Sequence, residues 1–257
     1  MSWKKEWIEV RGHRIYLEQF ETDKPMLVVL LHHGLGSVQA WRAQMDFLTS
    51  KGIPILAYDR WGYGQSDDRA QLDPPFFEED VQDLEAIVSQ LAKPLVLVGH
   101  SDGGNIALTY ASRHPENLRG VVVIAAHIYF EPKMASGMQE LVFSYQENEV
   151  FRKSLHRVHK GKPVFERWFQ AWTQLGMNWD MRRTLSSIPC PVFVVQGSED
   201  EHATIQHALD LTEALPNGRV QILAGMNHML PQKAAGIFNP LLNEALAEFQ
   251  KGNQYVQ

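Results

Sequence analysis

The sequence of 257 residues predicts an α/β fold, in which a mostly parallel sheet carries helices on both faces. Two observations lead to this prediction. Short runs of consecutive apolar residues, typical of strands buried on both faces, alternate with longer segments whose apolar residues recur at helical spacing. One long stretch, residues 127–187, interrupts this alternation and contains only helix-like segments. We therefore expect a central sheet with one helical insertion.

The strands are expected at the apolar runs, which follow an antiparallel hairpin near the start of the chain. The hairpin consists of Trp7–Val10, a turn at residues 11–13, and Arg14–Glu18. The six later runs are Met26–Leu31, Ile53–Tyr58, Pro94–Gly99, Leu118–Ala125, Pro191–Gln196 and Arg219–Leu223.

The helices that cover the sheet are expected in the segments between these runs. In residues 77–91, for example, the positions that share one helical face are all apolar: Val81, Leu84, Ile87, Val88 and Leu91. The five segments with such a pattern are Ala40–Ser50, Phe76–Leu91, Asp102–Ser112, Ala203–Leu215 and Ala234–Gln250.

The helical insertion divides the chain into two predicted units. Residues 1–126 and 188–257 form the core domain, and residues 127–187 form a small cap over the sheet. Residues 151–162 carry five basic side chains and no acidic one. We interpret them as a solvated helix face, because Phe151, Leu155 and Val158 fall on the opposite side. Attraction of anionic substrates is the alternative interpretation.

Composition and charge narrow the class of protein. The net charge of −6 argues against a general nucleic-acid-binding protein. The longest apolar stretches are far too short to span a membrane, and the first residues contain no apolar signal region, so we expect a cytoplasmic protein. Cys190 stands alone, which excludes an internal disulfide, and we expect it to be a buried structural thiol.

The motif most indicative of chemistry is the pentapeptide Gly-His-Ser-Asp-Gly at residues 99–103. It joins an expected strand to an expected helix, and Gly-x-Ser-x-Gly in that context is typical of a sharp turn that presents a nucleophilic serine. The residues two positions before and after Ser101 must be small, and both are glycine. We therefore predict that Ser101 is a nucleophile.

A serine nucleophile needs a general base, and the base needs an orienting acid. His228 follows the last apolar run, and Asp200 follows the run Pro191–Gln196, so both are expected at the edge of the sheet that carries Ser101. We predict His228 as the base and Asp200 as the acid. A metal site around Asp200 is disfavoured, because no second histidine pair has ligand spacing.

Two backbone N–H groups are expected to stabilise the oxyanion of an acyl-transfer intermediate. The first belongs to Leu35, in the glycine-containing turn His-His-Gly-Leu-Gly at residues 32–36. The second belongs to Asp102, which opens the helix after the nucleophile and therefore lies at the positive end of the helix dipole.

Taken together, these residues resemble the α/β-hydrolase superfamily, in which the order is serine, then acid, then histidine. Residues 58–66 (YDRWGYGQS) also look like the turn Asp-x-x-Gly-x-Gly-x-Ser of that family. The resemblance implies an eight-stranded, mostly parallel sheet with a helical cap after the sixth strand. It excludes dehalogenase-like and epoxide hydrolase-like members, which have aspartate where this chain has Ser101.

Three further segments look similar to valacyclovir hydrolase-like enzymes, which cleave amino-acid esters: residues 76–80, 101–104 and 188–197. In that family the acidic residue after the nucleophile contacts the ammonium group of the substrate. This resemblance implies such a role for Asp102. The alternative, which we favour, is that Asp102 only stabilises the start of its helix.

The sequence thus predicts a serine hydrolase that cleaves carboxylic esters of small molecules and needs no metal or organic cofactor. Met138, Trp168 and Trp172 in the cap are expected to line an apolar acyl pocket, and packing in the hydrophobic core is the alternative for each of them. Two alternatives stay open. One is a carbon–carbon bond hydrolase with the same three residues, for which Arg152 or Arg167 would bind a substrate carboxylate. The other is a small-molecule receptor on the same fold.

Overall fold

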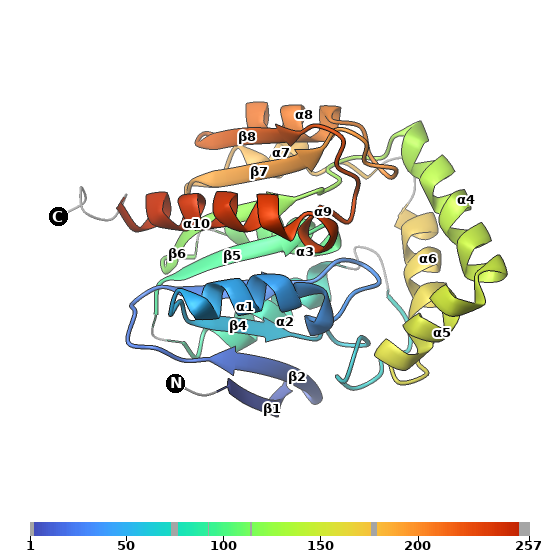
Figure 1. Cartoon of the computed structure of the whole chain (residues 1–257), viewed down its shortest axis with the longest axis horizontal. Coiled ribbons are helices and arrows are strands. Elements are labelled where there is room, and N and C mark those ends of the chain that lie inside the picture. Colours follow the sequence, from blue (N-terminus) through green and yellow to red (C-terminus); the bar gives the residue numbers. More distant parts are fainter. Residues whose placement is uncertain (1–2, 73–76, 92, 114, 176–178, 252–257) are drawn as a thin grey trace.

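An eight-stranded sheet forms the centre of the computed structural model, which describes residues 3–72, 77–91, 93–113, 115–175 and 179–251. Its strand order is β1-β2-β4-β3-β5-β6-β7-β8 (Figure 1). Strands β1 and β2 form an antiparallel hairpin, β2 pairs antiparallel with β4, and the remaining pairs are parallel. The strands are β1 Trp3–Val10, β2 His13–Phe20, β3 Leu27–Leu31, β4 Ile55–Tyr58, β5 Leu95–His100, β6 Leu118–Ile124, β7 Val192–Gly197 and β8 Gly218–Leu223.

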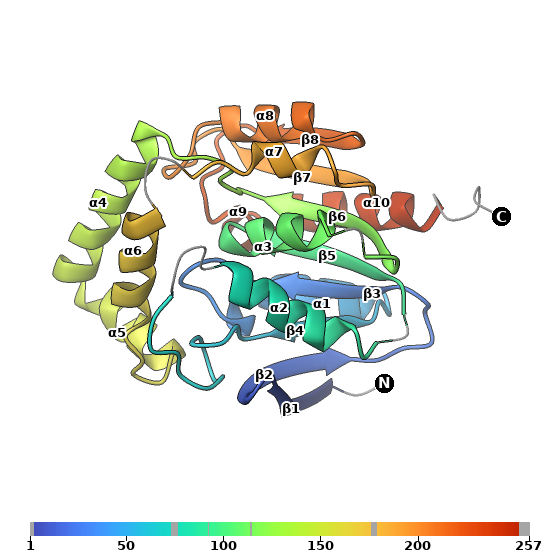
Figure 2. The same cartoon turned by 180° about the vertical axis from the view of Figure 1, so that it is seen from behind.

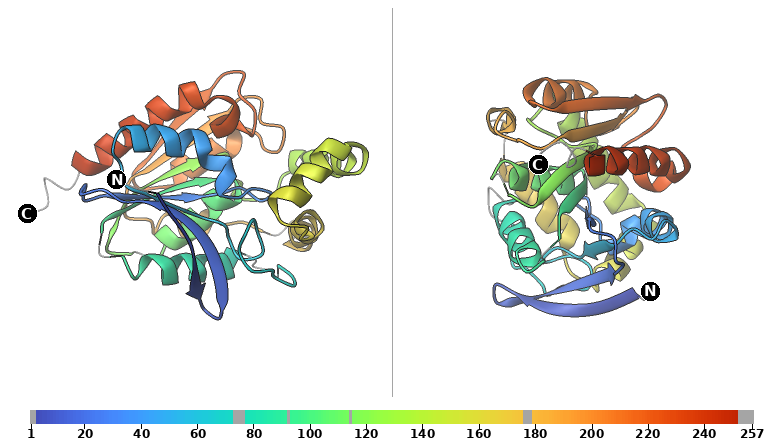
Figure 3. Two further views of the ribbon diagram at one scale, coloured as in Figure 1. Left: turned by 60° about the horizontal axis from the view of Figure 1, so that its bottom comes forward. Right: turned by 90° about the vertical axis from the view of Figure 1, so that its left-hand side faces the viewer.

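Helices cover both faces of this sheet (Figures 1 and 2). A short 3-10 helix η1 (Val38–Trp41), α1 (Arg42–Ser50), α9 (Leu230–Lys233) and α10 (Ala235–Lys251) lie on one face. On the other face lie α2 (Phe77–Val88), α3 (Asp102–Ala111), α7 (Arg182–Leu185) and α8 (Gln206–Ala214). Figure 3 shows the sheet edge-on, twisted between these two layers.

The continuous apolar strands follow from burial on both faces. In β3, Leu27, Val29 and Leu31 belong to one apolar core, whereas Val28 and Leu30 belong to the other. Because successive side chains of a strand point to opposite faces, a strand between two helical layers needs apolar residues at every position. The unbroken apolar runs in the sequence are therefore explained by the position of the strands between two layers of helices.

The predicted elements are confirmed, with small shifts at their ends. The hairpin is longer than expected and turns at Arg11 and Gly12, both of which have positive φ angles. Phe76, expected at the start of a helix, lies outside the described residues. Cys190 is buried as predicted, and burial raises the pKa of its thiol to about 11.

Three helices between β6 and β7 stand beyond one end of the sheet (Figure 1): α4 (Pro132–Glu147), α5 (Glu149–Val158) and α6 (Val164–Leu175). The short helix α7 instead lies beside α8, against the sheet. The division of the chain at residues 126/127 and 187/188 stays a prediction. We refer to α4, α5 and α6 as the cap.

Two basic residues of α5 make their contacts outside the inner surface of the cap. Lys153 pairs with Glu149 on α5, and Arg152 donates hydrogen bonds to the backbone oxygens of Tyr145 and Gln146. Phe151 and Leu155, on the opposite side of α5, line a cavity under the cap. This arrangement agrees with a solvated face for α5, whereas Lys162, beyond the end of α5, is half-buried and donates to the backbone oxygen of Gly64.

Within the described part of the chain, none of the helices is both long enough and apolar enough to cross a membrane. The cytoplasmic location stays a prediction.

Candidate functional site

The turn after β5 places Ser101 at the end of the sheet that faces the cap. Ser101 has φ 53° and ψ −120°, a strained conformation for a residue with a side chain, and α3 begins at the next residue. The backbone N–H of Ser101 donates to the oxygen of Ile124 at the end of β6, at 2.8 Å. The strained turn is therefore tied to the neighbouring strand.

The two glycines of the motif are required by the space around this turn. A Cβ on Gly99 would lie 2.2 Å from the backbone oxygen of Gly103, and a Cβ on Gly103 would lie 2.1 Å from that of Leu31. Both distances are shorter than any non-bonded contact between these atoms, so a side chain at either position would displace the backbone. This explains why the sequence has glycine two residues before and after Ser101.

His228 and Asp200 are brought together by the turns after β8 and β7. The Nδ1 atom of His228 lies 2.9 Å from Oδ2 of Asp200. His228 and Ser101 line the same cavity, and the side chain of Asp200 is fully buried behind His228. The structure thus brings the three residues expected from the sequence to one end of the sheet, where Asp200 contacts His228, and their catalytic roles stay a prediction.

Further hydrogen bonds hold the side chain of Asp200 and the backbone of His228 in place. Oδ2 of Asp200 accepts a hydrogen bond from Gln196 Nε2 at 2.8 Å, and Oδ1 accepts from the backbone N–H groups of His202 and Ala203. His100 Nε2 donates to the backbone oxygen of His228 at 2.9 Å. Sequence reasoning did not assign roles to Gln196 and His100, although His100 lies inside the motif.

The electrostatics of the His228–Asp200 pair favour the charged carboxylate. Burial alone would raise the pKa of Asp200, but His228 and the hydrogen bonds outweigh it and lower that pKa. Burial alone would lower the pKa of His228, yet the Asp200 carboxylate raises it above its ordinary value of 6.5. His228 can therefore take up a proton while Asp200 remains ionised.

The glycine-containing turn after β3 lies beside Ser101. Its backbone is closed by a hydrogen bond from the N–H of Gly36 to the oxygen of His33, at 2.9 Å, which leaves Leu35 at the tip. Leu35 lines the cavity together with Ser101 and Asp102. The N–H of Asp102 is in the first turn of α3, where helical N–H groups have no partner in the helix. The oxyanion role of Leu35 and Asp102 stays a prediction.

The side chain of Asp102 connects the nucleophile turn to the cap. Its Oδ2 accepts from Trp168 Nε1 at 3.0 Å, and its Oδ1 accepts from Trp172 Nε1 at 3.3 Å. Arg60 Nη2 lies 3.4 Å from the same Oδ2. Burial raises the pKa of Asp102, and the charge of Arg60 opposes that rise. The carboxylate therefore contacts two cap tryptophans and one core arginine.

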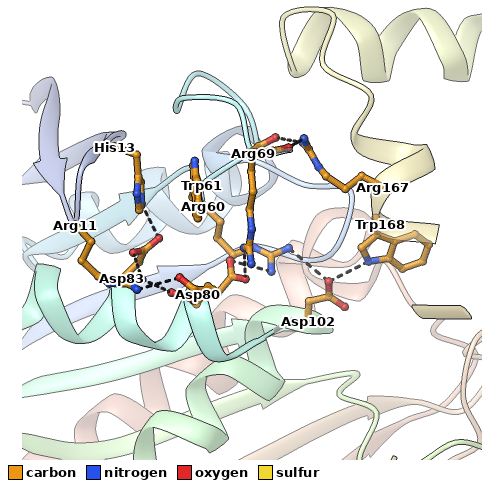
Figure 4. A network of polar contacts seen from close by, with 12 residues as sticks. Arg11, His13, Arg60, Trp61, Arg69, Asp80, Asp83, Asp102, Arg167 and Trp168 are labelled. Atoms are coloured by element: carbon orange, nitrogen blue, oxygen red, sulfur yellow. Dashed lines mark hydrogen bonds and ion pairs between the residues drawn. The ribbon is translucent and has the colours of Figure 1, made fainter. Parts of the chain in front are cut away.

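Behind Asp102 lies a chain of buried ion pairs (Figure 4). Arg60 lies between Asp102 and Asp80, whose Oδ1 is 3.5 Å from Arg60 Nη1, and Asp80 also pairs with Arg69 at 3.2 Å. Arg167, beside Trp168 in α6, donates to the backbone oxygens of Gly62 and Arg69. The hydrogen bonds of Arg167 therefore attach α6 of the cap to the loop after β4. They add to the contacts between Asp102 and the two cap tryptophans.

A cavity of about 710 Å³ lies between the strand ends and the cap. It has the size of small-molecule sites. Ser101 and His228 line it, and so do all four residues expected at the substrate: Asp102, Met138, Trp168 and Trp172. The described residues that line this cavity include no arginine or lysine. Its other walls are mainly apolar side chains of α4, α5 and α6.

Comparison with known proteins agrees with this geometry. The sequence model of the Alpha/beta hydrolase family matches residues 28–239, well over half of the chain. The serine hydrolase BPHL of Mus musculus is 28% identical over 229 residues, which covers 85% of this chain and 78% of the relative. The bifunctional esterase/perhydrolase DCH of Acinetobacter calcoaceticus is 26% identical over 246 residues, covering 82% and 88%.

The fold also matches solved structures. The esterase EaEST of Exiguobacterium antarcticum superposes with a TM-score of 0.78 at 19% identity, covering 94% of this chain and 98% of that one. The enol-lactonase of Burkholderia xenovorans LB400 gives a TM-score of 0.74 at 19% identity, covering 96% and 100%. These matches confirm the fold that the sequence predicted.

Proposed function

The chain belongs to the alpha/beta hydrolase family, and on this premise we propose that it hydrolyses uncharged carboxylic esters of small molecules through an acyl-enzyme on Ser101. One observation carries the proposal. Ser101 lies on a strained turn in the wall of a mainly apolar cavity. His228 lines the same cavity, and Asp200 is hydrogen-bonded to Nδ1 of His228.

In the acylation step, His228 takes the proton of Ser101 through its Nε2 as the serine oxygen attacks the ester carbonyl carbon. Asp200 keeps the proton of the imidazole on Nδ1 and stabilises the imidazolium. The carbonyl oxygen becomes an oxyanion, which the N–H groups of Leu35 and Asp102 stabilise. Collapse breaks the bond to the alcohol oxygen, and that oxygen receives the proton from His228.

In the deacylation step, water replaces the alcohol. His228 removes a proton from the water as its oxygen attacks the acyl carbon, and the same two N–H groups stabilise the second oxyanion. Collapse releases the carboxylic acid and returns the proton to Ser101. His100 supports both steps indirectly, because it holds the backbone of His228.

The cavity supports an uncharged acyl group. Its wall has no arginine or lysine among the described residues. Both described carboxylates that line it already have partners in the protein: Asp102 lies within 3.4 Å of Arg60, and Glu201 accepts a hydrogen bond from the backbone N–H of His228. At Asp102, a substrate ammonium would have to compete with Arg60, Trp168 and Trp172 for the same two oxygens. We propose that Asp102 holds the cap in place, so that an amino group is not needed on the substrate.

The contacts of two arginines disfavour the carbon–carbon hydrolase alternative. Arg167 donates hydrogen bonds to Asp68 and to backbone oxygens of the loop after β4. Arg152 donates hydrogen bonds to backbone oxygens of α4. Neither lines the cavity, so neither is placed to bind the carboxylate of a dienoate substrate.

The proposal is tested with p-nitrophenyl acetate, butyrate and octanoate under multiple-turnover conditions. We expect wild-type turnover that falls by orders of magnitude in Ser101→Ala. Activity that persists in Ser101→Ala would contradict the assignment of the nucleophile.

The same assay separates the two alternatives. Absence of turnover on all three esters would contradict the ester hydrolase. Turnover of a vinylogous diketone would then favour carbon–carbon hydrolysis. Binding without turnover, together with ligand-dependent protection of the cap from hydrogen exchange, would favour a receptor.

A further inference from the structure

His159, the residue that follows α5, connects the cap to two turns at the strand ends. Its side chain is fully buried. The backbone N–H of Gly64, in the loop after β4, donates to Nδ1 of His159 at 2.9 Å. Nε2 of His159 lies 3.1 Å from the backbone oxygen of Leu35, in the turn after β3. One side chain of the cap therefore joins the turns of two neighbouring strands.

The hydrogen bond from Gly64 decides which nitrogen of His159 carries the proton. Burial lowers the pKa of His159 to about 4, so the ring is neutral near pH 7. Because Nδ1 of this neutral ring accepts a hydrogen bond, the proton is on Nε2. Nε2 therefore donates to the oxygen of Leu35. Both nitrogens of the ring have partners in the backbone, so the ring holds backbone groups in place.

The contact with Leu35 fixes a peptide group at the tip of the turn. The oxygen of Leu35 and the N–H of Gly36 belong to one planar peptide group. His159 holds the oxygen, and the N–H donates to the oxygen of His33 at 2.9 Å. This peptide group is thus held at both ends and cannot rotate unless a hydrogen bond breaks.

Trp168 of α6 restricts the turn on the other side of Leu35. A Cβ on Gly34 would collide with the indole nitrogen of Trp168, so the indole lies directly against Gly34. The N–H of Leu35 belongs to the peptide group between Gly34 and Leu35. Among the described residues, no hydrogen bond from this N–H is present. The cap therefore restricts both sides of the turn and leaves the predicted oxyanion donor unused.

Attachment of the cap does not by itself require the contact with Leu35. Lys162 already attaches the same part of the cap to the loop after β4, because its Nζ donates to the oxygen of Gly64 at 2.7 Å. The hydrogen bond of His159 to Leu35 adds a contact with the turn that faces Ser101. A donor that is oriented before the reaction stabilises an oxyanion without reorganisation during the reaction.

We propose that His159 is a positioning residue for the oxyanion site, because it holds from the cap the turn that presents the N–H of Leu35. This inference rests on the proposed ester hydrolysis and adds a form of regulation to it. The oxyanion site is complete only while the end of α5 lies against the two turns. The position of the cap and the rate of catalysis are therefore coupled.

Three substitutions separate the two hydrogen bonds of His159. His159→Gln places an amide near Nε2 and keeps a donor for Leu35. His159→Asn places an amide near Nδ1 and keeps only the acceptor for Gly64, and His159→Phe removes both. With p-nitrophenyl butyrate, we expect kcat to fall on the order of tenfold or more in His159→Asn and His159→Phe, with KM within about twofold of wild type. His159→Gln is expected to recover part of kcat.

A matched pair of ketones separates positioning from packing. In butyl trifluoromethyl ketone, the Ser101 oxygen adds to the carbonyl carbon, the proton passes to His228, and the carbonyl oxygen becomes an oxyanion. Butyl methyl ketone has nearly the same shape and binds without this step. The readout is the ratio of the two inhibition constants, methyl over trifluoromethyl. We expect it to fall on the order of tenfold or more in His159→Asn and His159→Phe, in parallel with kcat.

Lys162→Met is the control, because it weakens the attachment of the same cap segment without touching the turn of Leu35. It is expected to keep the wild-type ratio. Equal ratios in wild type and His159→Asn would overturn the proposal, because a packing role would weaken the binding of both ketones alike. A ratio in His159→Gln as low as in His159→Phe would also overturn it.

The wild-type protein shows which of the two proposals fails. Fluorine NMR detects the adduct of the trifluoromethyl ketone, and the ester assay detects turnover. If the wild type forms no adduct and hydrolyses no ester, the proposed function fails and the role of His159 fails with it. If the wild type does both and the ratio is the same in every variant, the role of His159 alone is overturned.

Discussion

Asp102 and His228, two buried polar residues in the wall of the cavity, differ in how their side chains are hydrogen-bonded. The Asp102 carboxylate lies within 3.4 Å of donors on Arg60, Trp168 and Trp172. The ring of His228 is hydrogen-bonded to Asp200 through Nδ1, and among the described residues no hydrogen bond to its Nε2 is present.

This difference separates groups that hold the structure from groups that meet a substrate. A carboxylate whose hydrogen bonds are all made within the protein holds other parts of the protein in place. A ligand could bind to it only by replacing one of those hydrogen bonds. An imidazole nitrogen that has no partner in the protein and lies in the cavity wall is available for proton transfer. Asp102 therefore joins the cap to the core, and we propose that His228 takes part in the chemistry. Four predictions test this distinction.

The largest effect is expected for the orienting acid of His228. Asp200→Asn removes the charge that holds His228 in the required tautomer, so kcat is expected to fall on the order of 10³–10⁴-fold. The measurement is steady-state hydrolysis of p-nitrophenyl butyrate. Glu199→Gln, an exposed neighbour, is the control and is expected to keep wild-type activity. A comparable loss in Glu199→Gln would show that the orienting acid is misassigned.

The next effect is expected at Asp102 and concerns the stability of the protein. Asp102→Asn leaves Arg60 buried with Asp80 as its remaining acid partner, and we expect the free energy of unfolding to fall by about 3 kcal/mol. Urea denaturation measures the change. Asp180→Asn removes a partner of Arg182 at the surface and is expected to change the free energy of unfolding by less than about 0.5 kcal/mol. Equal stability of the two variants would contradict a structural role for Asp102.

A smaller effect concerns pH. His228 must be neutral to act as a base, and the Asp200 carboxylate raises its pKa above 6.5. Activity should therefore fall as the pH drops, with a midpoint above 6.5, because protonation removes the base. In Asp200→Asn the burial of His228 is no longer opposed, so the midpoint of the residual activity is expected to move to lower pH. A profile of kcat/KM against pH that is unchanged in Asp200→Asn would contradict the coupling.

The smallest effect is expected for substrate amino groups. Because Arg60 and two tryptophans already contact Asp102, the ethyl esters of valine and of isovaleric acid should have kcat/KM values within about threefold of each other. A preference for the valine ester above tenfold, lost in Asp102→Asn, would show instead that Asp102 binds the substrate ammonium.

Local motifs account for what the sequence could predict. The apolar runs and the Gly-x-Ser-x-Gly turn involve neighbours in the chain, so the strands and the place of Ser101 follow from short segments. His228 and Asp200 could be assigned because each follows a recognisable strand at the same edge of a parallel sheet.

Contacts between distant segments could not be predicted in this way. The partners of Asp102 lie 42 residues away at Arg60 and 66 residues away at Trp168, and no local pattern links them. The sequence therefore offered only helix stabilisation or substrate binding for Asp102. His159 falls within residues 151–162, where the charge pattern indicates only a solvated helix face, and its partners Gly64 and Leu35 are also distant in the chain.

The most direct test of the account is to trap the covalent intermediate. The protein is quenched in acid during turnover of p-nitrophenyl butyrate, digested, and examined by mass spectrometry, with Ser101→Ala treated in parallel. The account predicts a butyryl group on Ser101 in the wild-type protein and none on the corresponding peptide of Ser101→Ala. Turnover with a butyryl group on another residue, or turnover that continues in Ser101→Ala, would contradict it.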